Sequence, residues 1–300
     1  KTFPTVGLVG SAPHAGMYIS PAQALGVELL NVTDGKRCDV VTVIDKSIPS
    51  SFAKRLEADG VMVRPSVSAL SAASQRFNET TVNNSTLCVM VARSPHGQAT
   101  TWALTEIIRN DGLWSMSITP APGLNETLQE KAQQLALDIS AQLGVVGVIA
   151  VEFSEKDDDV SVVNVEMQPH SSGNWTVDGS ITSQYEQHLR AVLDLPLGDP
   201  AMVWPYVVTG NVYCGDKPNM YRPYLHLMAR TPAMKFHQYK GSFQSGELVG
   251  HVTLAGNDQQ EIIEEVKRRQ AELNSDEIRA GSSFKARAEL FANPNPDYLG

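Results

Sequence analysis

The sequence predicts an α/β protein of two or three domains, and three observations lead to this prediction. Its 300 residues exceed the length of one typical domain. Hydrophobic residues make up 42% of the chain and charged residues 19%, which allows a sizeable core and excludes a disordered chain. Short apolar runs alternate with helix-like segments in the first part of the chain, the order typical of a parallel sheet.

Charge and cysteine content narrow the class of partner and compartment. The formal net charge is −9, whereas nucleic acid needs a basic surface, so we expect no nucleic-acid partner. No run of about 18 apolar residues and no signal-peptide core is visible, so we expect no membrane partner. Three distant cysteines, Cys38, Cys88 and Cys214, have neither metal-site spacing nor a disulfide pattern. A reducing, cytoplasmic location follows as the expectation.

The N-terminal part reads as strand, turn, helix and strand. An apolar run at residues 6–9 leads into a turn rich in glycine and proline that begins at Gly10. Such a turn can hold phosphate at a helix N-terminus, but any strand-to-helix turn favours glycine, so both interpretations stay open. Further elements are expected as a helix at 22–25, strands at 27–30 and 39–45, and helices at 51–59 and 69–73.

The middle of the chain has the clearest periodicity. Asn125 is a good cap for a helix whose apolar side chains recur every three or four residues up to Leu143, and Gly144 is placed to end it. Other elements are expected as strands at 87–92, 100–108, 145–153 and 160–166, an acidic loop at 154–159 and a helix at 182–193. After the break at 195–200, the expected elements are strands at 207–213, 225–229 and 251–254 and a helix capped near Asn257.

Two acidic side chains and an amide lie in neighbouring expected strands. Glu152 interrupts an apolar run, and Asn164 and Glu166 end the strand that returns after the acidic loop. In a tight hairpin their oxygens lie side by side, and hard oxygen ligands suit Mg²⁺ and its nucleotide complex. A carboxylate in so apolar a run needs a partner. The alternatives are that Glu152 pairs with a buried arginine or points outward from an edge strand.

The loop at 169–176 directly follows this strand and is dense in hydrogen-bonding groups. It contains His170, Ser172 and Gly173, and its glycine allows a ligand to approach the backbone closely. The alternative is an ordinary polar turn with Trp175 packed on the core. Lys240, beside a glycine in a later loop, is either a phosphate contact or a solvated surface lysine.

Several blocks together resemble N5-carboxyaminoimidazole ribonucleotide synthetase, the ATP-grasp family that is the ATPase subunit of phosphoribosylaminoimidazole carboxylase. The resemblance runs in order from the first strand to the Gly250-His251 block. Its most specific part is the helix segment that follows the Ser-Gly-x-Trp-Thr loop. The blocks are residues 91–94, 109–112, 120–122, 147–152, 169–176 and 182–198.

The resemblance implies an ATP-grasp fold in three parts and a ligase activity. The parts are a Rossmann-like pre-ATP-grasp domain at 1–76, an ATP-grasp core at 77–199 and a small β-rich domain at 200–300. ATP and bicarbonate would give carboxyphosphate, and the carboxyl group would pass to aminoimidazole ribonucleotide in purine biosynthesis. The resemblance also implies a homodimer and the cofactors ATP and Mg²⁺.

The resemblance further assigns roles to individual residues. It implies that Glu152 and Glu166 bind the metal, and that Arg93 and Asn164 join them at the nucleotide. The remaining implied roles are catalysis for His170, Ser172 and Gly173, and substrate binding for Gly10, Tyr239 and Lys240.

The chain also departs from the family pattern. The family arginine before the loop histidine is Gln168, and a family glutamate near the N-terminal domain is Lys46. Basic positions near the C-terminus read Gln244 and Glu247. The chain looks abridged around Asp34-Gly35 and between residues 76 and 87, where ATP-grasp proteins carry a mobile lid, so we expect that the lid is absent or that segments are omitted there. Two alternatives therefore accompany the ligase: a scaffold with a binding or regulatory role, and a ligase with another acceptor.

Overall fold

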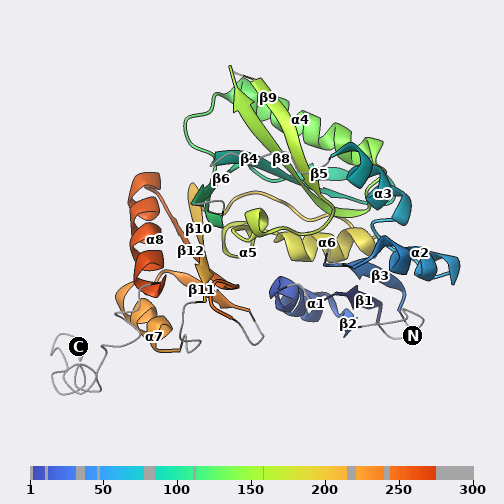
Figure 1. Cartoon of the computed structure of the whole chain (residues 1–300), viewed down its shortest axis with the longest axis horizontal. Helices are drawn as coiled ribbons and strands as arrows, with labels where there is room; N and C mark the ends of the chain where they lie inside the picture. The colour runs from blue at the N-terminus through green and yellow to red at the C-terminus, as the bar shows by residue number, and fades with distance from the viewer. Residues whose placement is uncertain are drawn as a thin grey trace.

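The computed structural model describes residues 3–10, 13–31, 38–45, 48–77, 85–110, 113–157, 159–214, 221–239 and 244–274. In these residues helices pack on a parallel sheet of three strands and on a large antiparallel sheet of nine. Figure 1 shows the small sheet beneath the large one, with α6 lying between them. The predicted α/β class is confirmed.

The small sheet forms from the N-terminal segments. Strand β1 (Thr5–Val9) lies between β2 (Glu28–Asn31) and β3 (Val40–Val43), parallel to both, and is buried along its whole length. Parallel neighbours need crossover connections, which pass through the helical segments of this region. The segments between β1 and β2 are η1 (Pro13–Tyr18) and α1 (Ile19–Leu25), whereas α2 (Ser50–Ala58) follows β3.

Helix α3 (Val67–Arg76) links the small sheet to the large one. The Ser66 hydroxyl accepts a hydrogen bond from the Ala69 amide and caps the helix. Ala69 and Ala73 are buried in the apolar cluster of the large sheet. The helix thus packs on the core, although the expected N-terminal domain at 1–76 includes it. The predicted domain boundaries stay predictions, and this packing places α3 with the core.

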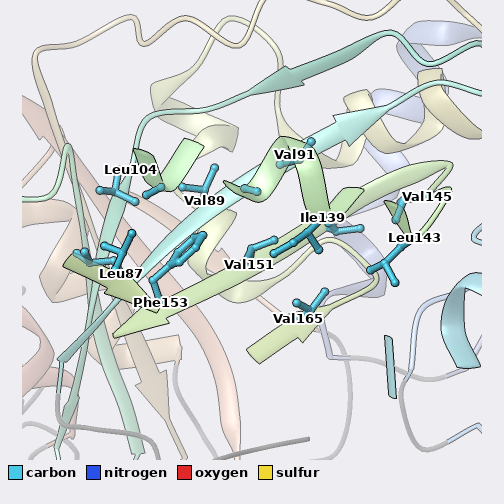
Figure 2. Packing of buried hydrophobic residues seen from close by; sticks show 14 of the residues in the cluster. Leu87, Val89, Val91, Leu104, Ile139, Leu143, Val145, Val151, Phe153 and Val165 are labelled. Carbon is cyan, nitrogen blue, oxygen red and sulfur yellow. The ribbon is translucent and has the colours of Figure 1, made fainter. Parts of the chain in front are cut away.

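The large sheet has the strand order β11-β12-β10-β7-β6-β4-β8-β9, with the short β5 beside β4. Helix α4 (Glu126–Gln142) covers one face of it, and α5 (Thr176–Gly179) and α6 (Gln184–Val192) lie over the other. Figure 2 shows the packed side chains beneath α4, including Val89, Val151 and Phe153. The core strands are β4 (Ser85–Arg93), β5 (Ala99–Thr101), β6 (Thr105–Asn110), β7 (Leu113–Thr119), β8 (Gly147–Lys156) and β9 (Asp159–Glu166).

The C-terminal part continues the same sheet rather than forming a separate one. Strand β10 (Tyr206–Tyr213) pairs with β7 on one side and with β12 (Leu248–Gly256) on the other. The remaining elements are β11 (Lys235–Gln238), α7 (Tyr221–Arg230) and α8 (Gln259–Asn274). Hydrogen bonding is therefore continuous across the predicted boundary at 199/200.

Three element predictions are wrong in type or extent. Residues 225–229 lie within helix α7, not in a strand: Tyr224 and Leu227 are both buried, a spacing that one helix face provides. The strand expected at 100–108 is divided into β5 and β6, which pair with different parts of β4. The buried Trp102 lies between them, and its indole donates to the Thr182 carbonyl oxygen. The acidic loop is shorter than expected, since β8 and β9 pair as far as Lys156 and Asp159.

The abridged segments leave little room for a lid. Residues 32–37 and 78–84 lie outside the described part of the chain, so the proposal of omitted segments is not tested there. Eight residues separate α3 from β4, too few for a folded subdomain. Among the described helices, none is long and apolar enough to cross a membrane.

Candidate functional site

Glu152, Asn164 and Glu166 share one face of the large sheet. Strands β8 and β9 are antiparallel, with Glu152 directly opposite Asn164 and Ala150 opposite Glu166. Directly opposed residues point to the same face, as do residues two apart on one strand. This is the face covered by α5 and α6, and the loop at His170 lies over it. The predicted arrangement of these three side chains is confirmed.

Glu152 is paired with Arg109, which is the arginine alternative raised from the sequence. Arg109 Nη2 lies 2.9 Å from Glu152 Oε2, and the two side chains are 10% and 3% exposed. Arg109 Nη1 donates to Thr86 Oγ1 at 2.7 Å, and the guanidinium carbon lies 5.6 Å from the Trp114 ring centroid. The register of β6 and β7 shifts after Ile108, so that Arg109 pairs with Trp114. The carboxylate thus has a buried cation beside it.

The implied magnesium ion does not fit this arrangement. Mg²⁺ takes near-octahedral oxygen ligands and needs anionic donors that are available to it. Glu152 is already engaged by Arg109, and Asn164 Nδ2 lies within 3.4 Å of Glu166 Oε1. Within the described residues, no three Asp, Glu, His or Cys side chains lie where they could share an ion. The metal role of Glu152 and Glu166 therefore stays a prediction.

The loop of His170 and Gly173 is held in one conformation by Gln184 of α6. The His170 amide donates to Gln184 Oε1 at 2.9 Å, and Gln184 Nε2 donates to the His170 carbonyl oxygen at 2.8 Å. A Cβ on Gly173 would lie 2.4 Å from Gln184 Oε1, so a larger residue there would displace the Gln184 side chain. The Thr176 hydroxyl donates to the Gly173 carbonyl oxygen. The loop is thereby held by contacts within the chain itself.

The side chains of this loop reach back to the strands. His170 Nδ1 lies 3.1 Å from Ser172 Oγ, which lies 3.2 Å from Cys88 Sγ on the strand next to Glu152. The His170 ring packs on Trp114 at a centroid distance of 4.9 Å. Burial and the Glu152 carboxylate raise the pKa of the Cys88 thiol. A neutral thiol is a poor nucleophile, so the cluster offers hydrogen bonds rather than covalent chemistry.

Asn174 connects the core to the C-terminal part. Its Nδ2 donates to the Tyr239 hydroxyl oxygen at 3.0 Å, and its Oδ1 accepts from the Tyr185 hydroxyl at 2.7 Å. Tyr239 in turn donates to His251 Nδ1 at 2.9 Å. Burial raises the pKa of Tyr239 and lowers that of His251 well below its usual value. The network is therefore neutral, with His251 Nε2 and His14 Nε2 buried and without a hydrogen-bond partner among the described residues.

The other residues that the sequence suggested for the site lie in different parts of the fold. Gly10 ends β1 with φ +114°, and a Cβ there would lie 2.3 Å from that of Asp45, so it shapes the edge of the small sheet. Arg93 lies on the opposite face of β4 from Cys88, because the two are an odd number of positions apart, and it donates to the Val145 carbonyl oxygen. The structure does not bring Arg93 to Glu152. Tyr239 joins the Asn174 network, whereas Lys240 lies outside the described residues.

Sequence reasoning missed three contributors: Arg109, Gln184 and Trp114. The residues around Arg109 are most simply interpreted as a hairpin turn, yet Arg109 stands two residues after the buried Ile107, an alternation that indicates the same face. The alternation is visible in the sequence, but the pairing of Arg109 with Glu152 depends on the order of the strands in the sheet. Gln184 carries no local signal, because its role follows from where α6 packs.

Comparison with known proteins agrees with the resemblance. Residues 67–185 match the family model described as ATP-grasp domain. N5-carboxyaminoimidazole ribonucleotide synthase of Mycobacterium bovis is 44% identical over 182 residues, which are 59% of this chain and 42% of that protein. The Corynebacterium ammoniagenes enzyme is 41% identical over 197 residues, 63% of this chain and 46% of that protein. The chain thus spans less than half the length of these curated relatives.

Solved structures extend the agreement to the fold. N5-carboxyaminoimidazole ribonucleotide synthetase from Thermus thermophilus matches with a TM-score of 0.77 at 22% identity, covering 90% of this chain and 98% of that one. The Aspergillus clavatus synthase, solved with ADP and 5-aminoimidazole ribonucleotide, gives 0.80 at 18% identity, covering 91% and 99%. Residues 67–185 thus match an ATP-grasp domain, and the chain has the fold of the N5-carboxyaminoimidazole ribonucleotide synthetases, which its sequence resembles.

Proposed function

We propose that this chain is an ATP-dependent carbon–nitrogen ligase that carboxylates aminoimidazole ribonucleotide with bicarbonate through carboxyphosphate. The observation that carries the proposal is the shared sheet face of Glu152, Asn164 and Glu166 beneath the prearranged His170 loop. The curated relatives named for this activity, at 41–44% identity, support it. The cytoplasmic location and the homodimer are carried over from the family resemblance as part of the proposal. Magnesium is not, because Arg109 already engages Glu152.

In this proposal the described residues orient groups and exclude water. Glu152, Ser172 and Asn174 are almost wholly buried, which suits a labile carboxyphosphate that water would destroy. The Gln184 clamp holds the His170 backbone, so its imidazole meets bicarbonate or the acceptor in a fixed position. Arg109 and the loop donors face negative charge that develops during phosphoryl transfer.

A phosphate-release assay tests the proposal on the complete natural chain. Wild-type protein should release phosphate from ATP when bicarbonate and aminoimidazole ribonucleotide are added. Glu152→Gln should abolish the stimulation, since it removes the anion that organises the site. His170→Ala should impair use of bicarbonate or acceptor more than nucleotide binding. Glu155→Gln, an exposed carboxylate on the same strand, is the matched control and should behave as wild type. A folded wild-type protein without stimulated phosphate release rejects the ligase.

A scaffold without ligase activity is the second candidate, and the Arg109–Glu152 pair favours it. The pair neutralises the carboxylate that the resemblance assigns to metal, and eight residues separate α3 from β4, where the lid is expected. Calorimetric titration separates the two candidates. A scaffold would bind aminoimidazole ribonucleotide or ATP without turnover, whereas the ligase would bind both and release phosphate.

A further inference from the structure

Arg109 is anchored at Glu152 from three directions. Thr86 on β4 accepts from one terminal nitrogen, Glu152 on β8 accepts from the other, and Trp114 on β7 lies against the guanidinium. The arginine itself comes from β6, so four strands fix its position. With 10% exposure it has lost most of its water contact. Such a planar, multiply held cation is a permanent part of the site rather than a passing surface contact.

We propose that Arg109 is the built-in counter-cation of Glu152 and that a divalent metal ion and this guanidinium are alternatives at that carboxylate. The inference rests on the proposed function only for the identity of the site, because the ion pair is formed by two residues of this chain. It predicts that Glu152 is not available to a metal ion until Arg109 leaves.

The charges at the site indicate that a divalent ion and Arg109 exclude each other rather than share the Glu152 carboxylate. A buried carboxylate needs one positive neighbour, and Arg109 already supplies it at 2.9 Å. A divalent ion placed at the same carboxylate would stand within a few ångströms of the guanidinium, and two cations repel strongly where water is scarce. On the same face Asn164 is neutral, so Glu166 adds one negative charge to that of Glu152, against the three positive charges of a divalent ion and the guanidinium.

Mn²⁺ tests this proposal without nucleotide, bicarbonate or acceptor, because it takes the same oxygen ligands as Mg²⁺. Binding would be followed by the electron paramagnetic resonance signal of the free ion and by thermal unfolding, with the complete chain. Wild type and Glu152→Gln should bind Mn²⁺ equally weakly. Arg109→Met, which keeps the apolar stem but removes the charge, should bind at least about tenfold more tightly. Its melting temperature should rise by about 5 °C with saturating Mn²⁺.

Arg190→Met is the matched control. Arg190 forms an ion pair with Glu186 on α6, and its removal also frees one carboxylate, but both side chains lie on one helix and are about a quarter exposed. This variant should gain no affinity for Mn²⁺. A gain equal to that of Arg109→Met would mean that any freed carboxylate binds the ion, which overturns the assignment to this site.

The comparison of wild type with Glu152→Gln can also overturn the proposal. If wild type binds Mn²⁺ and Glu152→Gln loses that binding, the ion and Arg109 share the carboxylate and are not alternatives. If Arg109→Met folds and binds no more tightly than wild type, exclusion by Arg109 is rejected. If Arg109→Met does not fold, the comparison of wild type with Glu152→Gln still decides. Absence of ATP turnover would reject the proposed ligase and leave all of these outcomes unchanged.

Discussion

The two faces of the same core strands have opposite character. On β4 and β8, Val89 and Val151 point towards α4 into a purely apolar cluster, shown in Figure 2. The alternate residues Cys88 and Glu152 point to the other face, where thiol, hydroxyl, imidazole and guanidinium groups meet. One strand thus serves two purposes, because its side chains alternate. Residues that pack the core and residues of the candidate site therefore alternate along the same strands.

The largest expected effect lies on the α4 face. Phe153 is fully buried among apolar neighbours, so Phe153→Ala should lower the free energy of unfolding by about 3–5 kcal/mol. Phe153→Leu should cost about 1.5 kcal/mol or less, because it conserves more of the volume. Urea denaturation measures both. Equal losses for the two variants would show that this face is not closely packed and would break the contrast between faces.

On the opposite face, the ion pair should be costly to break but not to replace. Arg109→Met leaves the buried Glu152 without its cation and should cost about 3 kcal/mol of unfolding free energy. Replacing both partners with Arg109→Met and Glu152→Met should recover most of that loss, because no charge then stays buried. Urea denaturation of the single and double variants gives the coupling free energy between Arg109 and Glu152. A double variant as unstable as the sum of the singles would contradict this account.

The sequence predicts periodic features well and spatial pairings poorly. The Asn125 cap is found as expected, with its side chain accepting from the Leu128 amide, because capping is local. The hairpin of Glu152 and Asn164 is also predictable from alternation and a short loop. The role of Arg109 is not, since its partner lies 43 residues away on a strand whose neighbours depend on the whole topology. The segment of helix α7 is wrongly predicted as a strand because a short apolar run fits either period.

A pH-dependent stability is expected on the polar side of the sheet. His188 of α6 is buried between Thr42 Oγ1 and the Val148 amide, and burial lowers its pKa to about 3. The unfolded chain has a histidine pKa of about 6.5, so it binds the proton more readily than the folded state. The contribution of neutral His188 to the free energy of unfolding is therefore complete above about pH 6.5 and is lost as the pH falls towards 3. From pH 7 to pH 5 it should cost about 2 kcal/mol.

The variant His188→Gln distinguishes the pH dependence due to His188 from that due to other buried histidines. His14 and His251 also have lowered pKa values, so wild type should lose stability from several groups together. The variant should show a shallower fall between pH 6 and pH 4, by about 1.4 kcal/mol per pH unit. Urea denaturation at each pH measures the slope. An unchanged slope would mean that His188 does not titrate on unfolding.

The smallest expected effect concerns the link between the polar face and the C-terminal part. Tyr239→Phe removes the hydroxyl that accepts from Asn174 and donates to His251, leaving both side chains without that partner. The expected loss is about 1.5 kcal/mol of unfolding free energy, because the groups left behind are neutral and buried. Tyr206→Phe is the matched control, since its hydroxyl has no hydrogen bond within the described residues, and it should change stability by less than about 0.5 kcal/mol. If the two variants lose equal stability in urea denaturation, the Asn174 network does not couple the core to the C-terminal strands. The polar face would then end at the His170 loop.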